Sequence, residues 1–508
     1  MTGNKACDWE GVHINMFKIL RKTVRIKVGT EEVKRCLTYR IFDKFRVMLN
    51  AVIDTGCVPN IFNPEILCPL PKVPGSADIN DSRPIGLIEF LRGCIEGAQA
   101  KAIDRTWDEH SMMALQSGFM KGRSTDDNRA MSTAISEFCY MMKLAAFISN
   151  QDNRHAFDSP DTCGGIEAGE LKRRIPGRWI RLSAKMFRKG FVQVRTPHGL
   201  SDPLSKAAGC TQGGRASPGK WNAFMQPNND EWSKDNDDFY IPISGSLVWK
   251  TSGRPYADDQ RIVKPTAAAL ARRMGNNSAF AMFHETEIQI QKSQSQVLEW
   301  TPDRSRRLAP WEISFRPHFL RTLRCECSPP CLSETAIPVQ TEMLHVEDGL
   351  KTLGEMSSPH ACWDAALQKL QQVAHDGAVS LRQKMPRDIA VRFVQTAVFM
   401  KCRYGIKWAS LSQQQVETAM APVWKAYKAT IATPVSTSTA ALKAFGFGDF
   451  WYELNTDRLI TFIRLLSGKD EHSRWAIQSM LHIEQMWYGG ALFSYKHLTT
   501  STEGGRAR

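Results

Sequence analysis

Apolar positions recur along this chain with two different spacings, and each spacing predicts a different secondary structure. Over residues 33–52 they recur every three to four residues, the spacing of one helix face, and the same spacing runs over 17–24. We expect helices over both ranges, over about 126–143, and over most of the chain from 365 onward. Short apolar or alternating runs predict strands at 144–148, 192–194 and 288–293.

An acidic turn interrupts this pattern. The sequence Tyr256-Ala257-Asp258-Asp259 stands between two apolar runs, 248–249 and 262–263, and this arrangement predicts a hairpin with two carboxylates at its tip. Neighbouring side chains on a strand diverge, so one carboxylate can hold a metal while the other points aside. By itself, an Asp-Asp turn is also typical of a solvated loop.

Composition and charge narrow the class of protein. With 508 residues, of which 42% are hydrophobic, the chain is expected to fold into several globular units, and no run of 18 apolar residues predicts a membrane span. The polar start lacks a signal-peptide core, and 13 scattered cysteines suit a reducing compartment. We therefore expect an intracellular protein, nuclear or cytoplasmic and not secreted. The net charge of +14 indicates a polyanionic partner, either nucleic acid or an anionic membrane surface.

Half of the excess charge lies in one helical stretch. Residues 365–430 hold ten Lys or Arg and three Asp or Glu, an excess of +7, and aromatic residues interleave with the basic ones. A basic face carrying aromatic rings suits a nucleic-acid backbone, whereas an ordinary amphipathic bundle with solvated lysines is the alternative. The residues concerned are Trp408, Trp424 and Tyr427 among Lys401, Arg403, Lys407, Lys425 and Lys428.

Cations also flank two candidate loops earlier in the chain. Lys72 and Arg83 border a polar turn and are expected to flank one hairpin, as two cations facing an anion or as two solvated charges. Lys121 and Arg123 stand in a loop with two glycines, which can lay backbone N–H groups and cations along a phosphate chain.

A third carboxylate, Asp152, follows the strand expected at 144–148 and precedes Phe157 by five residues. Carboxylates from separate strands suit metal-assisted nucleotidyl transfer, in which two Mg²⁺ ions stabilise the attacking and the leaving oxygen. Mg²⁺ prefers oxygen ligands and keeps waters and substrate phosphates around it.

The order of these motifs resembles the reverse transcriptase domain of non-LTR (LINE-type) retrotransposons. Residues 5–12 look like its opening finger motif, and residues 116–125 read Gln-Ser-Gly-Phe-Met-Lys-Gly-Arg-Ser-Thr where the family has Gln-Ser-Gly-Phe-Arg-Lys-Gly-Arg-Ser-Thr. Residues 152–158 and 256–259 resemble the two catalytic motifs, and Leu353-Gly354 resembles the primer grip. The resemblance covers about residues 1–360 by motif and is expected to continue to about 490.

The resemblance implies a role for each matching residue. Asp152, Asp258 and Asp259 would be the catalytic metal carboxylates, holding two Mg²⁺ ions or Mn²⁺. Phe157 would be a steric gate against a ribose 2′-hydroxyl, which disfavours an RNA-templated RNA polymerase. Residues expected to bind the incoming nucleotide are Lys72, Arg83, Phe157, Gln212, Gly213 and Lys292, and those expected to bind nucleic acid are Lys121, Arg123, Lys401, Arg403 and Lys407.

The implied fold is an α+β right hand with a helical C-terminal extension. Its parts would be the fingers and the start of the palm (1–125), a palm with an antiparallel sheet (126–360), a basic helical thumb (361–435) and a helical region with a polar tail (436–508). The partners implied are an RNA template, a DNA primer and dNTPs, with no membrane partner and an oligomeric state that the sequence leaves open.

Three departures from the family pattern keep a second function open, a catalytically decayed domain that only binds RNA or DNA. Residues 149–151 read Ser-Asn-Gln where the family has an apolar strand, which predicts a shifted or looser Asp152. Pro255 removes a ladder donor beside the acidic turn. Thr211 and residues 214–216 replace the family's usual Pro and Ser-Pro-Leu around Gln212-Gly213.

A zinc site is a further candidate. Cys325, Cys327, Cys331 and His345 could bind Zn²⁺, although their spacing is not that of a standard finger or knuckle. The neighbouring Pro329-Pro330 indicates a loop.

Overall fold

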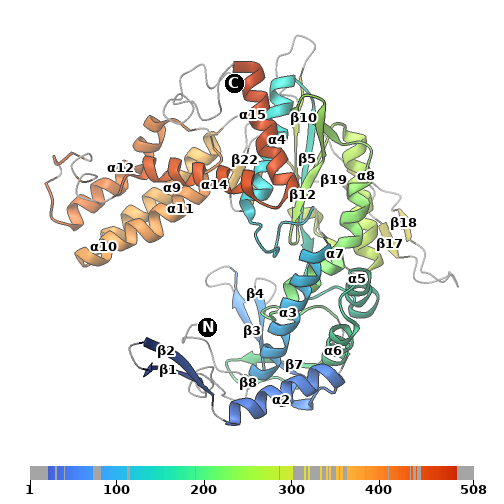
Figure 1. Ribbon diagram of the computed structural model, residues 1–508. Coiled ribbons are helices and arrows are strands. Elements are labelled where there is room, and N and C mark those ends of the chain that lie inside the picture. Colours follow the sequence, from blue (N-terminus) through green and yellow to red (C-terminus); the bar gives the residue numbers. More distant parts are fainter. Residues whose placement is uncertain are drawn as a thin grey trace. The chain divides into compact units, whose positions relative to one another are not determined.

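The chain is a mixed α/β protein (Figure 1). The computed structural model describes residues 21–28, 31–38, 40–72, 82–110, 115–154, 156–188, 190–206, 208–284, 286–300, 314–315, 318–320, 332–334, 339–340, 342–344, 350–353, 355–357, 363–383, 385–409, 411–434, 436–438, 442 and 448–488. The chain forms two compact units, each assembled from separate segments. The first unit comprises Met1–Met113, Asn153–Glu231 and Phe280–Glu287, and the second comprises Ala114–Asp152, Trp232–Ala279 and Ile288–Arg508.

The first unit is built around a five-stranded sheet. Strands β3 and β4 pair as an antiparallel hairpin, β7 lies parallel to β3, and β8 and β9 both pair with β7. The strands are β3 (Pro64–Pro71), β4 (Ser82–Ile88), β7 (Phe191–Thr196), β8 (Gly199–Leu200) and β9 (Leu204–Ser205). The helices of this unit are α2 (Arg40–Thr55), α3 (Phe90–His110), α5 (Ala168–Lys172), α6 (Gly177–Arg188) and most of α7 (Ser217–Ser233).

The two earliest helix predictions are wrong in part. Residues Arg21–Val28 and Glu31–Thr38 form the antiparallel strands β1 and β2, and the helix expected over 33–52 begins only at Arg40. Val24, Ile26 and Val28 alternate with polar residues, a period of two that favours a strand. The helical spacing is real from Arg40 onward, so the error lay in extending it across the strand.

The second unit contains the other five-stranded sheet, with strand order β12-β13-β5-β15-β20. The first four strands pair antiparallel, and β20 is parallel to β15. The strands are β12 (Gly253–Tyr256), β13 (Asp259–Lys264), β5 (Ala146–Gln151), β15 (Gln294–Leu298) and β20 (Glu342–Met343). The strand predicted at 144–148 is therefore confirmed, with its start shifted to Ala146 and its end extended to Gln151.

Alternate residues of β5 serve two different cores, one on each face of this sheet. Ile148 packs with residues of α4 (Thr125–Met142) and α15 (Glu471–Tyr488), whereas Phe147 packs with residues of α8 (Ala267–Phe283). Figure 1 shows α4 and α8 on opposite faces of the sheet. The helix expected over 126–143 is confirmed as α4. Its Ser124 forms a capping box with Asp127, which fixes the start of the helix.

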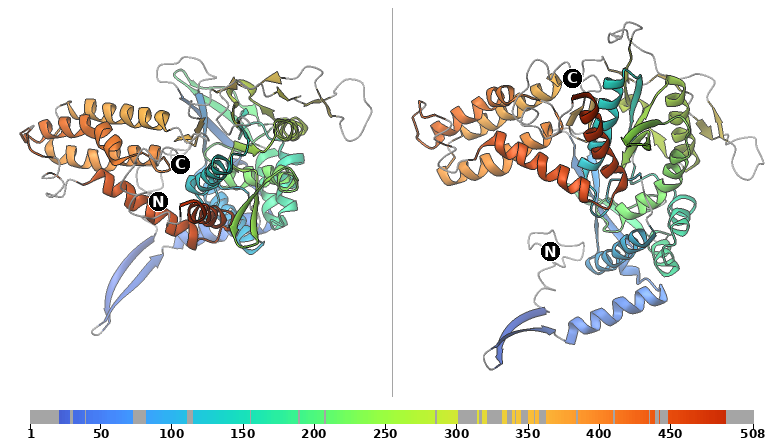
Figure 2. Two further views of the ribbon diagram at one scale, coloured as in Figure 1. Left: turned by 90° about the horizontal axis from the view of Figure 1, so that it is seen from above. Right: turned by 45° about the horizontal axis from the view of Figure 1, so that its top comes forward.

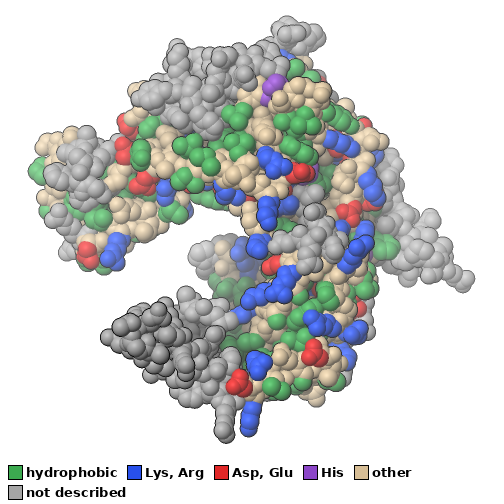
Figure 3. Space-filling view, viewed as in Figure 1, with side chains coloured by type: hydrophobic (Ala, Val, Ile, Leu, Met, Phe, Trp, Pro, Cys, Tyr) green, Lys and Arg blue, Asp and Glu red, His purple; other side chains and the backbone are tan. Residues whose placement is uncertain are grey.

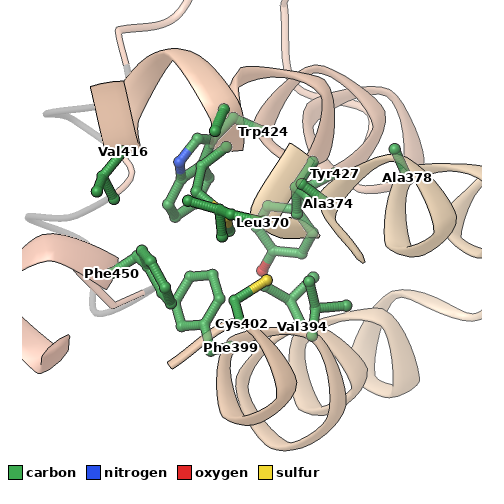
Figure 4. Close-up of a cluster of buried hydrophobic side chains, with 14 of the residues drawn as sticks. Leu370, Ala374, Ala378, Val394, Phe399, Cys402, Val416, Trp424, Tyr427 and Phe450 are labelled. Carbon is green, nitrogen blue, oxygen red and sulfur yellow. The ribbon is translucent and has the colours of Figure 1, made fainter. Parts of the chain in front are cut away.

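The helices expected from residue 365 onward are confirmed and pack around their own core. They are α9 (Asp364–Leu381), α10 (Arg387–Phe393), α11 (Phe399–Ile406) and α12 (Gln413–Thr430), with the π-helical turn η5 (Val394–Val398) between α10 and α11. Both views of Figure 2 show α9, α11 and α12 running side by side. Trp424 and Tyr427 of α12 point into this core beside Phe399 and Cys402 (Figure 4).

Smaller elements complete the second unit. They are the hairpin β10 (Phe239–Ser244) and β11 (Leu247–Thr251), the hairpin β21 (Leu350–Thr352) and β22 (Glu355–Ser357), the pairs β16 (Ser314–Phe315) with β19 (Val339–Gln340) and β17 (His318–Leu320) with β18 (Leu332–Glu334), and the helix α14 (Phe450–Ser467). None of the helices in the described part of the chain has the length and apolar character needed to cross a membrane.

Candidate active site

The acidic turn forms the tip of a tight hairpin in the second unit. Strands β12 and β13 pair with Tyr256 opposite Asp259, so Ala257 and Asp258 are the two residues of the turn. Ala257 has a φ of 55°, in the region that favours glycine. The predicted hairpin is therefore confirmed at the turn and at 262–263, but the strand that enters the turn is Gly253–Tyr256, and residues 248–249 belong to β11, which pairs with β10.

Strand register brings the third carboxylate to the same place. Strand β13 pairs antiparallel with β5, with Gln260 opposite Gln151. The next positions in this register are Asp259 and Asp152, one residue beyond the last pair of the ladder. Opposed residues of an antiparallel pair share a face of the sheet, so the backbone places these two carboxylates together at one end of the sheet.

The carboxylates influence one another electrostatically. Partial burial, and then the negative charges of Asp258 and Asp152, raise the pKa of Asp259 to about 7. Asp259 is at the same time a solvent-exposed residue, so water and counterions screen this repulsion. A divalent cation near these carboxylates would relieve it further, because an adjacent positive charge favours their ionised form.

Asp152, Asp258 and Asp259 carry the oxygen donors that Mg²⁺ prefers. Within the described residues, no group of three or more His, Cys, Asp or Glu side chains is already arranged to hold a metal ion. Mg²⁺ is often bound by only one or two carboxylates together with substrate phosphates and waters. Mutual repulsion among Asp152, Asp258 and Asp259 matches such an incomplete site, and these are the residues that would hold the metal.

A glutamine that the sequence placed only within a motif clamps the turn. Gln116 Oε1 accepts hydrogen bonds from the backbone N–H of Ala257 at 2.9 Å and of Gly118 at 2.8 Å, and its Nε2 donates to the Ala257 carbonyl at 3.4 Å. A Cβ on Gly118 would lie 2.3 Å from Ala257 N. Residues 116–118 therefore support the acidic turn directly.

The polar residues before Asp152 do not form a loose loop. Ser149 and Gln151 lie within β5 and are buried, so the expectation of a looser approach to Asp152 is wrong. Gln151 Oε1 accepts a hydrogen bond from Asn277 Nδ2 at 2.7 Å, and Asn277 Oδ1 accepts one from Arg273 at 2.7 Å. At the end of β5, the hydrogen bond from Asn277 of α8 to Gln151 thus takes the place of the apolar packing that the family pattern would provide.

Pro255 is compatible with the sheet because β12 is its edge strand. An edge strand has one side without a ladder partner, so a missing N–H costs little there. The Pro255 carbonyl accepts a hydrogen bond from the Ser117 N–H at 3.3 Å. Pro255 therefore does not disrupt the hairpin.

Lys292 lies in a short 3₁₀ helix and not in the expected strand. The strand predicted at 288–293 is wrong beyond Ile288, which ends the short strand β14 (Glu287–Ile288). Residues Ile290–Lys292 form the helical turn η4, and the strand β15 begins at Gln294. The turn remains close to the first aspartate, because the Gln289 N–H donates to the Asp152 carbonyl at 2.8 Å. Lys292 itself is exposed.

In the first unit, Lys72 and Arg83 flank one hairpin as predicted. Arg83 pairs with Leu70 in the β3–β4 ladder, and Lys72 follows the last residue of β3. Both cations are exposed. Their contact with a triphosphate stays a prediction.

Gln212 and Gly213 lie in a loop held against β4. The Gly86 N–H donates to the Gln212 carbonyl at 2.7 Å, and the Gln212 side chain donates to Asp158 Oδ2 at 2.7 Å. Gly213 has a φ of 108°, which requires glycine at this position. The helix α7 follows this loop and begins at Ser217.

A buried ionic network that sequence reasoning missed supports this loop. Arg92, 0% exposed, donates to Glu65 at 2.5 Å and to Glu96 at 3.0 Å. Glu65 also accepts from the Thr211 hydroxyl at 2.7 Å. Burial alone would raise the pKa of Glu65, but Arg92 and Lys206 outweigh it and lower that pKa to about 2. The only sequence signal was the occurrence of charged residues within apolar stretches.

Phe157 is half-buried and packs on α7. Its ring lies 5.5 Å from that of Trp221, and the Cys210 N–H donates to its backbone carbonyl. This contact fixes the ring within the first unit. Its role as a steric gate stays a prediction.

The five residues predicted to bind nucleic acid differ in their surroundings. Lys121 and Lys401 are exposed. Arg123 forms an ion pair with Asp470 at 2.9 Å, Arg403 one with Glu453 at 3.4 Å, and Lys407 one with Asp126 at 3.1 Å. The last three therefore have partners within the protein, and a contact of any of the five with nucleic acid stays a prediction.

The expectation that aromatic rings share a basic surface in residues 365–430 is wrong. Trp408, Trp424 and Tyr427 are buried, with Tyr427 only 1% exposed. The face shown in Figure 3 carries Lys and Arg only in places over α9–α12, among acidic and apolar side chains. Helical spacing indicated an amphipathic bundle correctly but did not indicate which side chains faced inward.

His472 is expected to make the stability of the second unit depend on pH. Its Nδ1 accepts a hydrogen bond from Trp249 Nε1 at 3.1 Å, which requires neutral imidazole, and burial followed by the nearby Arg254 lowers its pKa to about 4. In the unfolded chain the pKa of this imidazole is about 6.5. Neutral His472 therefore contributes up to about 3 kcal/mol to the free energy of unfolding, and this contribution is complete above about pH 6.5 and lost as the pH falls through about 4.

We therefore expect amide exchange in α15, corrected for intrinsic rates, to speed up between pH 7 and pH 4.5. Replacing His472 with glutamine keeps a hydrogen-bond acceptor but removes the titration. An equal pH dependence in parent and H472Q would contradict this assignment. The carboxyl of Asp470, whose pKa is lowered mainly by Arg254 against the effect of burial, contributes its pH dependence only below this range.

Several expectations lie outside the described residues. They are the finger motif at 5–12, Gly354 of the primer grip, and the zinc candidates Cys325, Cys327, Cys331 and His345. Leu353 is described, and its carbonyl accepts a hydrogen bond from the Tyr404 hydroxyl at 2.6 Å.

No protein-family model matches this sequence, and no curated protein sequence matches it. Its fold is similar to solved telomerase structures at low scores. The match to the apo telomerase of Candida tropicalis covers 95% of this chain and 76% of that one, with a TM-score of 0.37 and 9% identity. A second match, to the telomerase of Candida albicans in complex with a fragment of telomeric RNA, covers 95% of this chain and 74% of that one, with a TM-score of 0.38 and 8% identity. For a C-terminally truncated Candida tropicalis telomerase, the match spans 57% of this chain and 61% of that one, with a TM-score of 0.36 and 10% identity.

Proposed function

We propose that this chain is an RNA-directed DNA polymerase of the non-LTR retrotransposon type, which adds dNTPs to a primer 3′-end. The observation that carries the proposal is the strand register, which sets Gln151 opposite Gln260. Asp152 and Asp259 are the next residues at this end of the sheet, and Asp258 lies in the adjoining turn. The order of the sequence motifs around these residues supports it. The sheet and the helical bundle of the second unit would be the palm and the thumb of a right-hand polymerase.

The aspartates would hold Mg²⁺, or Mn²⁺, between them. Bound there, the metal would stabilise charge on the attacking 3′-oxygen and on the leaving pyrophosphate. Asp259 pairs with Tyr256 in the β12–β13 ladder and Asp152 directly follows β5, whereas Asp258 lies in the turn. The protein's contribution is thus to hold carboxylates together against their own repulsion.

Other residues would bind the substrates. Lys72, Arg83 and Lys292 would neutralise the triphosphate, because cations stabilise phosphate oxygens. Gln212 and Gly213 would contact the incoming nucleotide. RNA template and DNA primer would bind along exposed basic side chains, among them Lys121 and Lys401, with Arg123, Arg403 and Lys407 as further candidates.

One observation favours a second function, a decayed domain that binds nucleic acid without catalysis. The buried strand end next to Asp152 contains polar atoms without a hydrogen-bond partner, among them Ser149 Oγ and Gln151 Nε2. Such an atom destabilises a strand that an active enzyme needs to keep rigid. The bond between Gln151 and Asn277 favours the enzyme, because it compensates for the polar substitution in the same strand.

Primer extension on poly(rA)/oligo(dT), with and without Mg²⁺, tests the proposal. An active enzyme extends the primer with dTTP only when a divalent metal is present. A protein that binds the duplex in a salt-dependent manner but extends nothing at any Mg²⁺ or Mn²⁺ concentration would support the second function. Absence of both extension and binding would refute both.

Replacing Phe157 with valine tests the steric gate. We expect incorporation of ribonucleotides to rise by about tenfold or more relative to dNTPs, because a removed clash relaxes discrimination without removing catalytic groups. The measurement is kcat/KM for rUTP and dTTP on the same primer. Phe283→Val, an exposed aromatic on α8, is the matched control. Unchanged selectivity in an active F157V enzyme would show that the ring serves packing against Trp221.

A further inference from the structure

Asp470, just before α15, accepts contacts from two arginines that belong to different elements. Arg254 of β12 binds it through two nitrogens, at 2.6 Å and 2.9 Å, and Arg123 of the loop before α4 binds it at 2.9 Å. The side chain of Arg254 is 0% exposed and that of Asp470 is 8% exposed. A two-nitrogen contact of this kind fixes direction as well as distance.

The first arginine leads straight to the acidic turn. Arg254 precedes Pro255 and Tyr256, and Ala257 and Asp258 follow. Its Nε also donates to the Leu115 carbonyl at 2.6 Å, so the guanidinium is held from two sides. A shift of this arginine would move the strand that enters the turn.

The second arginine reaches the same turn by a different route. Arg123 Nη1 donates to the Gln116 carbonyl at 2.5 Å, and the Gln116 side chain accepts the N–H of Ala257. The two routes from Asp470, through β12 and through the Gln116 loop, therefore meet at the two-residue turn that carries Asp258.

The start of α15 is itself fixed to the rest of the unit. Ser473 accepts a hydrogen bond from Arg254 Nη1 at 3.2 Å, and its hydroxyl donates to Asp127 Oδ1 of α4 at 2.9 Å. Arg464 of α14 contacts the same Asp127 at 3.4 Å. The helices α14 and α15 are thus connected to the sheet by polar contacts as well as by their apolar core.

We propose that Asp470 is a positioning residue, which sets the acidic turn through Arg254 and through Arg123 and Gln116. The helical region after residue 436, which the sequence suggested to be an extension, then contributes to the active site without touching substrate. This inference rests on the proposed polymerase function for its catalytic consequence, but its structural consequence can be measured independently.

The test compares D470N with two control variants. Asparagine keeps the size of the side chain but removes its charge, and the buried Arg254 loses its ionic partner. Glu471→Gln changes the neighbouring exposed carboxylate, and Ile477→Val destabilises α15 in its apolar core without touching the ion pairs. Amide exchange is measured for peptides spanning 253–262 and, as an internal reference, for α8.

We expect exchange in the turn peptide of D470N to rise by about tenfold or more, with α8 unchanged, because local opening need not involve the whole unit. Primer extension should lose about 10- to 100-fold in kcat with the KM for dNTP within about threefold, as expected for misplaced catalytic groups. Both controls should stay near the parent in turn exchange and in kcat.

Turn exchange and kcat in folded D470N no different from those of I477V would overturn the inference. If D470N does not fold, Arg123→Met removes only the route through Gln116, and unchanged turn exchange in that variant would overturn the inference equally. A parent that extends no primer refutes the proposed function instead, while the exchange measurement still decides whether Asp470 sets the turn.

Discussion

Replacing Asp259 with asparagine is expected to lower primer extension by at least about 1,000-fold, because the change removes a carboxylate that would hold the catalytic metal. Asparagine has nearly the shape of aspartate, so β13 and its pairing with β5 should persist. Affinity for an RNA–DNA duplex without Mg²⁺ and dNTP should stay within a few-fold of the parent, since phosphate contacts carry that affinity. The measurements are single-turnover extension and duplex binding.

A carboxylate on the same sheet provides the control. Glu342 of β20 is exposed and accepts a hydrogen bond from Gln294 at 2.8 Å. We expect Glu342→Gln to leave extension near the parent rate. The metal assignment would be wrong if folded D259N kept more than about a tenth of the parent activity at saturating Mg²⁺.

Replacing Gly118 with alanine is expected to reduce kcat about 100-fold through the backbone of the acidic turn. The added Cβ would lie 2.3 Å from Ala257 N and 2.9 Å from both Ala257 Cα and Cβ. Backbone atoms cannot rotate away as a flexible side chain can, so either Gly118 or the turn must move. A displacement of about 1 Å in a catalytic group is enough for a loss of this size.

Gly122→Ala separates this effect from ordinary glycine strain. Gly122 has a φ of 78°, so alanine costs about 1 kcal/mol there, but a Cβ would have no atom within 4 Å. We expect G122A to lower stability with little change in kcat, and G118A to lower kcat and to speed amide exchange at Ala257. A G118A enzyme with kcat within about threefold of the parent would show that the turn tolerates the displacement.

These predictions concern different residues but the same two-residue turn. Asp259 follows the turn, Gly118 packs against it, and Asp470 is connected to it through two arginines. The effects of G118A and D470N should not be additive, because residues acting through a shared backbone segment are coupled. A double variant whose kcat lies within about threefold of that of the more impaired single variant would fit this coupling.

Local spacing in the sequence predicts the elements that carry the three aspartates. The strand before Asp152, the acidic hairpin and the helix after the Lys121-to-Thr125 loop were all predictable, because each follows from the spacing of nearby residues and from a local cap. The hairpin between Lys72 and Arg83 was predictable for the same reason. Where the local pattern was mixed, as at residues 33–38, the spacing misled and a strand formed instead of a helix.

Packing between distant elements determines which residues support the acidic turn. Asp470 lies more than 200 positions after Arg254 in the chain, and no local pattern indicates that their charges are buried together. The same holds for Gln151 with Asn277, and for Trp424 and Tyr427, whose rings face the core and not the basic surface. Local spacing specifies which residues share a face of one element. Burial and ion pairing depend on which other element packs against that face, and packing between elements decides this.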